Sequence, residues 1–208
     1  MAATIQLMYS ELQNKFGLTD FKSESQKEVT KHVYEDALIE QRDVFINMPS
    51  GFGKSLCFQL PVLSKDYAFA IVITPTIALA THQVDYLRSK NIMAYCWNAY
   101  TPNSIKYIIK KDLIKKKPKI KFLYISPEQC QSLHFQVIMA KVNLRVSYYF
   151  VIDEAHCVSP SSHNFRKCYQ SLDRIRTKYP HVPILAMSST ITKKVTLFYN
   201  QLNIVNCV

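Results

Sequence analysis

Short apolar runs alternate along the chain with longer segments in which apolar residues recur at helical spacing. The run from Tyr67 to Thr74 is nearly all apolar, as expected of a strand buried on both faces. The other runs that predict strands are Asp43–Asn47, Ala94–Trp97, Lys121–Ile125, Tyr148–Ile152 and Ile184–Met187. Strands that alternate with helices predict an α/β fold, in which a parallel sheet carries helices on both faces.

The helical segments lie before the first strand and between the later ones. We expect a short helix that ends at Gly17, then a second helix to about Glu40 with Ser23 or Ser25 as its N-cap. Proline is expected to stop the helix after the first strand near Pro61. Further helices are expected over 75–90, 101–117, after 128, over 165–179 and up to 202. The chain is thus expected to consist of a helical segment over 1–40 and one α/β domain over 41–208.

Composition narrows the class of protein. A chain of 208 residues that is 48% hydrophobic suits one large domain, or at most two small ones, and argues against disorder. No apolar run approaches the roughly 20 residues of a membrane span, and no secretory signal is evident, so no membrane partner is expected. The six cysteines are scattered without a Cys-x-x-Cys pair, which favours free thiols. A net charge of +11 fits a nucleic-acid partner, although a generally basic surface would give the same total.

Polar clusters follow the predicted strands at the points where they end. In parallel sheets, ligands bind at the carboxyl ends of the strands. Because all these clusters fall at that edge, we expect them to form one functional surface. The clusters are Pro49–Ser55, Thr74–Thr76, Ser126–Glu128, Asp153–His156 and Ser188–Thr190.

The first cluster has the features of a phosphate-binding loop. Two of the chain's three glycines, Gly51 and Gly53, lie between an apolar run and a helical segment, where a tight turn would direct backbone N–H groups at an anion. Lys54 would reach the phosphates and Ser55 would ligate Mg²⁺. The strict motif has a further glycine where this chain has Met48. An ordinary strand–turn–helix joint is the alternative, but the flanking strand and helix favour phosphate binding.

A pair of acids ends a later apolar run. Asp153 and Glu154 follow Phe150–Ile152 directly. In a phosphate-loop ATPase, Asp153 would hold Mg²⁺ opposite Ser55 and Glu154 would orient the attacking water. The alternative is that the acids stabilise the N-terminus of a following helix.

These motifs resemble, in order and spacing, the first RecA-like lobe of superfamily 2 helicases, and in detail that of RecQ-type DNA helicases. The resemblance covers roughly residues 10 to 205 and includes a DEAH-type motif II at Asp153–His156. It also accounts for Met48, because this family does not keep the first glycine. It implies a RecA-like P-loop domain that uses ATP and Mg²⁺ and acts on single-stranded or junction DNA. It further implies 3′–5′ unwinding in nuclear DNA recombination and repair.

The resemblance assigns roles to individual residues. Gln26 would read the adenine edge, with Lys22 beside it. Residues that hold the nucleotide would be Pro49, Ser50, Gly51, Phe52, Gly53, Lys54 and Ser55; the catalytic set would be Lys54, Asp153 and Glu154, with Ser55 and Asp153 on the metal. Residues that contact DNA or couple it to hydrolysis would be Thr74, Pro75, Ser126, Pro127, Glu128, His156, Phe165, Arg166, Ser188, Ser189 and Thr190.

The chain departs from the family in three places. The loop 159–166 keeps Phe165 and Arg166 but lacks the family's tryptophan and glycine, and Asn164 replaces an aspartate. His82 stands where an acid is usual, and the chain ends where a second lobe should begin. We therefore expect the chain alone not to unwind DNA. The alternative is a truncated ATP- or nucleic-acid-binding or regulatory module without turnover, whereas a GTPase or small-molecule kinase is disfavoured because no Asn-Lys-x-Asp motif is present.

Lysines crowd the segment from 106 to 121. A solvated helix face is the favoured interpretation. Contact with DNA phosphates, or nuclear import through Lys115–Lys119, are the alternatives.

Overall fold

A six-stranded parallel sheet forms the centre of the protein in the computed structural model, which describes residues 2–142, 144–153 and 173–189. The strand order is β1-β6-β5-β2-β4-β3, and every neighbouring pair is parallel. The strands are β1 (Val44–Asn47), β2 (Ala68–Ile73), β3 (Ala94–Trp97), β4 (Phe122–Ile125), β5 (Ser147–Ile152) and β6 (Ile184–Ser188). The predicted α/β fold is confirmed, and each strand lies where an apolar run predicts it.

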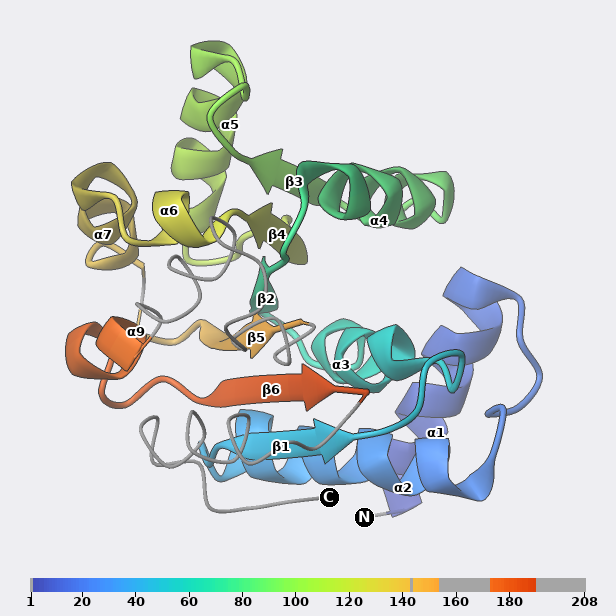
Figure 1. The fold of residues 1–208 in the computed structure, drawn as a ribbon. Coiled ribbons are helices and arrows are strands. Elements are labelled where there is room, and N and C mark those ends of the chain that lie inside the picture. The colour runs from blue at the N-terminus through green and yellow to red at the C-terminus, as the bar shows by residue number, and fades with distance from the viewer. Residues whose placement is uncertain (1, 143, 154–172, 190–208) are drawn as a thin grey trace.

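Successive residues of the strands point into two separate hydrophobic cores, one on each face of the sheet. In β2, Ala70 and Val72 join one core, whereas Ile71 and Ile73 join the other. The first core is covered by α1 (Ala2–Glu11), the π-helix η1 (Leu12–Phe16), α2 (Glu24–Val33), the π-helix η2 (Tyr34–Ile39), α3 (Lys54–Leu63) and α4 (Ile77–Ser89). The second is covered by α5 (Asn103–Leu113), α6 (Pro127–Cys130), α7 (Leu133–Met139) and α9 (Asp173–Lys178) (Figure 1).

The N-terminal helices pack against the lobe. Leu12, Val29 and Val33 lie in the same core as residues of α3 and the sheet. Gly17 ends η1 with a positive φ of 70°, and the Ser23 side chain caps α2 by accepting a hydrogen bond from the Gln26 N–H at 3.1 Å. This packing places α2 beside the loop that follows β1.

Two predicted helix boundaries were wrong, and a third helix runs slightly past its predicted end, each for a local reason. Pro61 lies inside α3, which continues to Leu63 because its neighbours Leu60 and Val62 are completely buried. α4 begins at Ile77, because the Thr76 side chain accepts a hydrogen bond from the Leu79 N–H at 3.2 Å.

α5 ends at Leu113, before the predicted end at residue 117. The carboxylate of Asp112 accepts hydrogen bonds from the backbone N–H groups of Lys119 and Ile120, both at 2.8 Å, and so folds the chain back. The lysines after Leu113 therefore lie in a turn. In the part of the chain that the structure describes, no helix has the length and apolarity to cross a membrane.

Candidate functional site

The carboxyl ends of the strands bring most of the predicted site residues to one edge of the sheet. Asn47 of β1 is in register with Ser188 of β6, and Ile73 of β2 is in register with Ile152 of β5 and Ile125 of β4. The phosphate-type loop, Thr74, Ser126, Asp153 and Ser188 consequently follow or end neighbouring strands.

The loop between β1 and α3 has the backbone of an anion cradle. Gly51 and Gly53 have φ values of 81° and 78°, which favour glycine. Gly53 is the N-cap residue of α3. Because it has no side chain to accept a hydrogen bond, no capping side chain occupies the N–H groups of the first helical turn. The Lys54 ammonium donates to the carbonyl oxygens of Met48 at 3.0 Å and Pro49 at 3.3 Å, which holds its charge at the loop. This geometry suits a polyphosphate.

Met48 fits the loop without being a glycine. Its φ is not positive, its side chain is 4% exposed, and its sulfur lies 4.0 Å from that of Cys57. Its N–H donates to the Ser188 carbonyl at 3.2 Å. The position thus packs under the loop and joins it to the end of β6.

Gln26 fastens α2 to the same loop. Its side-chain Nε2 donates to the carbonyl oxygens of Phe52 at 3.2 Å and Gly53 at 3.1 Å, and its Oε1 accepts from the Lys22 N–H at 2.8 Å. The Lys22 ammonium donates to the Gly51 carbonyl at 2.6 Å. A Cβ at Gly53 would come within 2.3 Å of the Gln26 Nε2, so any other residue there would displace the end of the Gln26 side chain. The resemblance assigns Gln26 and Lys22 to the adenine base. In the structure, both side chains bond to the loop between β1 and α3.

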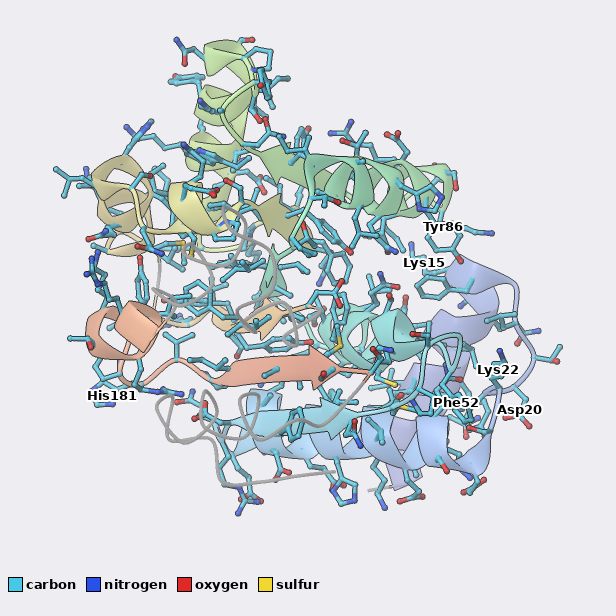
Figure 2. The ribbon with its side chains drawn as sticks, viewed as in Figure 1. Lys15, Asp20, Lys22, Phe52, Tyr86 and His181 are labelled. Atoms are coloured by element: carbon cyan, nitrogen blue, oxygen red, sulfur yellow. The ribbon has the colours of Figure 1, made fainter. Side chains whose placement is uncertain are left out.

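A cavity of about 600 Å³ opens beside Gln26 and the loop. One wall carries the stacked rings of Phe16 and Tyr86, whose centroids are 6.4 Å apart. Figure 2 shows Asp20, Lys22 and Phe52 gathered on this side of the molecule. The lining residues are Phe16, Leu18, Asp20, Lys22, Gln26, Gly51, Gly53, Ser55, Leu56, Gln59, His82, Gln83 and Tyr86. A cavity of this size, with flat rings at one end and a glycine-rich loop at the other, suits a nucleotide.

The residues fit ATP and Mg²⁺ by their chemistry. The loop and Lys54 would hold the phosphates. Ser55 lines the cavity and Asp153 directly follows β5, and both side chains carry the hard oxygen ligands that Mg²⁺ prefers. Glu154, His156, Phe165, Arg166 and Thr190 lie outside the described residues.

A second cavity, of about 370 Å³, lies at the ends of β2, β3 and β4. All five residues that the sequence assigned to DNA in these two loops line it: Thr74, Pro75, Ser126, Pro127 and Glu128. Trp97, Asn98 and Tyr124 also line it and were not predicted to contact DNA. The structure therefore brings the two predicted DNA-contact segments together around one hollow.

A buried polar pair connects the two cavities. Gln59 lines the first, Tyr124 lines the second, and the Gln59 Nε2 donates to the Tyr124 hydroxyl at 3.5 Å. Burial, aided by the nearby charge of Asp153, raises the pKa of Tyr124 well above its ordinary value, although the bond from Gln59 opposes this. Tyr124 is therefore a neutral phenol at physiological pH. A polar Gln59 within the apolar run from Leu56 to Leu60 was the sequence signal for this pair.

Comparisons with known proteins show what the chain as a whole is similar to. The family profile described as DEAD/DEAH box helicase matches residues 23–198. The mouse protein "ATP-dependent DNA helicase Q5" is 38% identical over 187 residues, which are 89% of this chain and 18% of that relative. The Bacillus subtilis protein "Probable ATP-dependent DNA helicase RecS" is 32% identical, over 86% of this chain and 34% of that relative. The chain thus spans about a fifth to a third of the length of these two relatives.

A solved structure shows the same fold. The helicase MrfA superposes with a TM-score of 0.68 at 22% identity, over 99% of this chain and 32% of that chain.

Proposed function

Because this chain belongs to the DEAD/DEAH box helicase family, we propose that it is the ATP·Mg²⁺-binding lobe of a RecQ-type DNA helicase. The observation that carries the proposal is the double attachment of α2 to the phosphate loop, through Gln26 and Lys22. This attachment holds the Gln26 amide and a second cation, Lys22, beside the loop that would bind the phosphates.

Within this proposal the helical segment 1–40 supplies the base-reading residues, and 41–208 supplies the phosphate, metal and DNA contacts. Lys54 would neutralise the β- and γ-phosphates, Ser55 and Asp153 would hold Mg²⁺, and Glu154 would orient the attacking water. Gln26 would select adenine. Bound Mg²⁺ would supply charge stabilisation at the phosphates.

We further propose that the second cavity receives the backbone of single-stranded DNA. It is lined by Thr74 and Ser126 at the ends of adjacent strands. Unwinding, in the 3′–5′ direction that the resemblance implies, would require a second RecA-like lobe to close over the nucleotide. A nuclear role in recombination and repair is proposed on the same resemblance.

Nucleotide binding tests the proposal most directly. Titration with a fluorescent ATP analogue should give saturable, Mg²⁺-dependent binding that Lys54→Ala abolishes, while Lys116→Ala, at an exposed lysine outside the loop, should bind as the wild type does. Wild-type affinity in Lys54→Ala would show the site assignment to be wrong.

Base selection and turnover need separate measurements. Gln26→Ala should reduce the preference for ATP over GTP, whereas Gln13→Ala, at an exposed glutamine of η1, should not. DNA-stimulated ATP hydrolysis that Glu154→Gln removes would support a motor lobe. ATP binding without hydrolysis would instead support a binding or regulatory module.

A further inference from the structure

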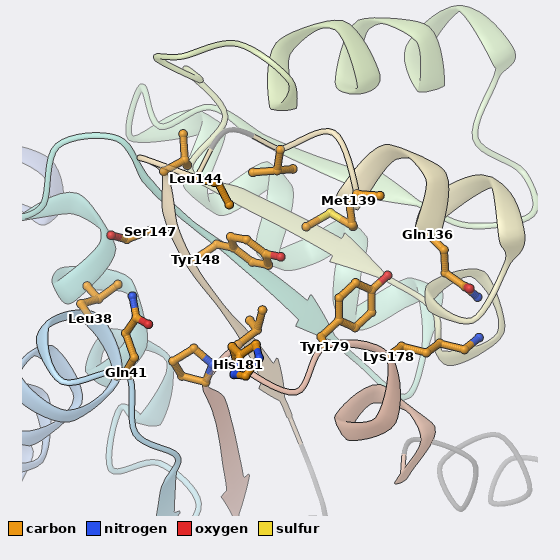
Figure 3. Close-up of a pocket in the computed structure, with 16 residues that line it drawn as sticks. Leu38, Gln41, Gln136, Met139, Leu144, Ser147, Tyr148, Lys178, Tyr179 and His181 are labelled. Atoms are coloured by element: carbon orange, nitrogen blue, oxygen red, sulfur yellow. The ribbon is translucent and has the colours of Figure 1, made fainter.

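A cavity of about 630 Å³ lies at the opposite edge of the sheet, where the strands begin. Its walls come from the start of β5, the connection between α9 and β6, the end of α7 and the end of η2 (Figure 3). His181, at this cavity, lies on the other side of the molecule from Lys22 and Phe52 (Figure 2). This cavity shares no lining residue with either of the two cavities described above, so it is a separate cavity.

Two tyrosines with fixed rings form its inner walls. The Tyr148 ring stacks on Phe69 with centroids 5.1 Å apart and an angle of 2° between the planes. The Tyr179 ring packs on Phe150 at 5.0 Å. Met139, Val146 and Pro183 add apolar surface. The cavity is thus preformed and offers flat apolar walls, as small-molecule sites do.

The Tyr179 hydroxyl is the unusual group of this cavity. It is inaccessible to solvent, yet it has no hydrogen-bond partner among the described residues. Burial raises the pKa of Tyr148 to about 12, and it also raises the pKa of Tyr179. Both side chains are therefore neutral phenols that can donate a proton to an acceptor. A buried donor without an acceptor is rare in folded proteins, and a ligand oxygen would satisfy it once the Tyr179 side chain turns its hydroxyl toward the cavity.

The polar residues at the opening of the cavity indicate the charge of the ligand. Lys178 and His181 are exposed at the cavity, and Gln41 and Gln136 add amide donors. Among the described residues that line it, none is Asp or Glu. The field at the opening therefore favours an anion.

We propose that this cavity binds a small aromatic carboxylate, with its ring between Tyr148 and Met139 and its carboxylate on the Tyr179 hydroxyl and the Lys178 side of the rim. The aromatic walls select the ring and the donors select the charge. The proposal stands independently of nucleotide binding at the other edge of the sheet.

The experiment is a titration of the ¹⁵N-labelled 208-residue chain with 2-naphthoate, followed by NMR. Backbone signals of Ser147, Tyr148 and Val182 should shift and saturate, and neutral 2-naphthylmethanol should bind at least about threefold more weakly. Tyr179→Phe should weaken 2-naphthoate by about fivefold, the loss expected for one hydrogen bond. Tyr107→Phe, at an exposed tyrosine of α5, should leave the affinity unchanged.

Three outcomes would each overturn the proposal. They are an absence of shifts at these residues at millimolar 2-naphthoate, an unchanged affinity in Tyr179→Phe, and displacement of 2-naphthoate by saturating ATP. If the phenylalanine variant does not fold, Lys178→Gln provides the second test, because it should weaken 2-naphthoate without affecting 2-naphthylmethanol.

Discussion

Gln59 and Tyr124 form a hydrogen bond at 3.5 Å that spans the space between the two strand-end cavities. Gln59 is 2% exposed and Tyr124 is 1% exposed, so the contact is shielded from water. One residue belongs to the helix that follows the phosphate loop, and the other belongs to the strand that leads to Ser126. The pair is therefore a direct contact through which we expect a change at one cavity to reach the other.

We expect Tyr124→Phe to weaken the coupling between ATP and DNA. The measurement is the affinity for a single-stranded oligonucleotide with and without a non-hydrolysable ATP analogue. Couplings between sites typically change an affinity by about 5- to 150-fold, and in Tyr124→Phe this ratio should move toward one. Tyr149→Phe removes a buried hydroxyl from β5, which β2 separates from β4, and Tyr149 lines neither cavity, so this variant should keep the wild-type ratio. An unaltered ratio in Tyr124→Phe would contradict the relay.

Gly53 has a conformation that favours glycine, and a side chain added there would also displace the end of Gln26. Its φ of 78° disfavours other residues, and an added Cβ would lie 2.3 Å from the Gln26 Nε2. Gly53→Ala should therefore displace Gln26 and reduce ATP affinity by about tenfold or more, since left-handed strain alone is worth about 1–2 kcal/mol.

Gly17 supplies the matched control. Its φ is 70°, but nothing lies within 4 Å of an added Cβ. Gly17→Ala should lower the free energy of unfolding by about 1 kcal/mol and leave ATP affinity unchanged. If Gly17→Ala and Gly53→Ala lost the same amount of ATP affinity, the contact with Gln26 would not explain the loss in Gly53→Ala.

The strands were predictable because their signal is local. Tyr67–Thr74 and Tyr148–Ile152 are apolar runs, and burial on both faces of a parallel sheet requires such runs. The glycine-containing turn between β1 and α3 was predictable because Gly51, Gly53 and Lys54 are close in sequence. The polar clusters at the strand ends then followed from the parallel topology.

The missed features depend on contacts that the spacing of apolar residues along the chain does not reveal. The end of α5 depends on Asp112 reaching Lys119 and Ile120, which helical spacing does not reveal. From the sequence alone, Gln26 is expected to be a surface glutamine. It is only 2% exposed, because its side chain bonds to Phe52 in the loop 26 residues further along the chain. The cavity at Tyr179 combines four elements, and no motif marks it.

Asp43 and Arg176 join the beginning of β1 to the end of α9. Their side chains form an ion pair, and they are 16% and 19% exposed. The other Asp43 oxygen accepts from the Ile184 N–H at 2.8 Å, and Arg176 also donates to the carbonyls of Pro180 and Val182. Asp43→Ala should lower the free energy of unfolding by about 2–3 kcal/mol, because it leaves a largely buried guanidinium and an N–H without this acceptor.

The control for this prediction is an exposed pair. Arg42 and Glu40 are both 52% exposed, so Glu40→Gln should change stability by less than about 0.5 kcal/mol. Urea unfolding followed by circular dichroism measures both variants. A loss in Asp43→Ala as small as that in Glu40→Gln would mean that the buried pair contributes nothing.

Two buried tyrosine hydroxyls should respond to deletion with opposite signs. The Tyr179 hydroxyl has no partner among the described residues, whereas the Tyr149 hydroxyl donates to the Phe58 carbonyl. Tyr179→Phe removes an unsatisfied donor, so it should raise the free energy of unfolding by about 1 kcal/mol, and Tyr149→Phe should lower it by about 1–2 kcal/mol. Thermal and urea unfolding without added ligand measure both changes. Destabilisation by Tyr179→Phe would show that this hydroxyl has an acceptor in the folded protein, and the ligand proposed for its cavity would then lose its main support.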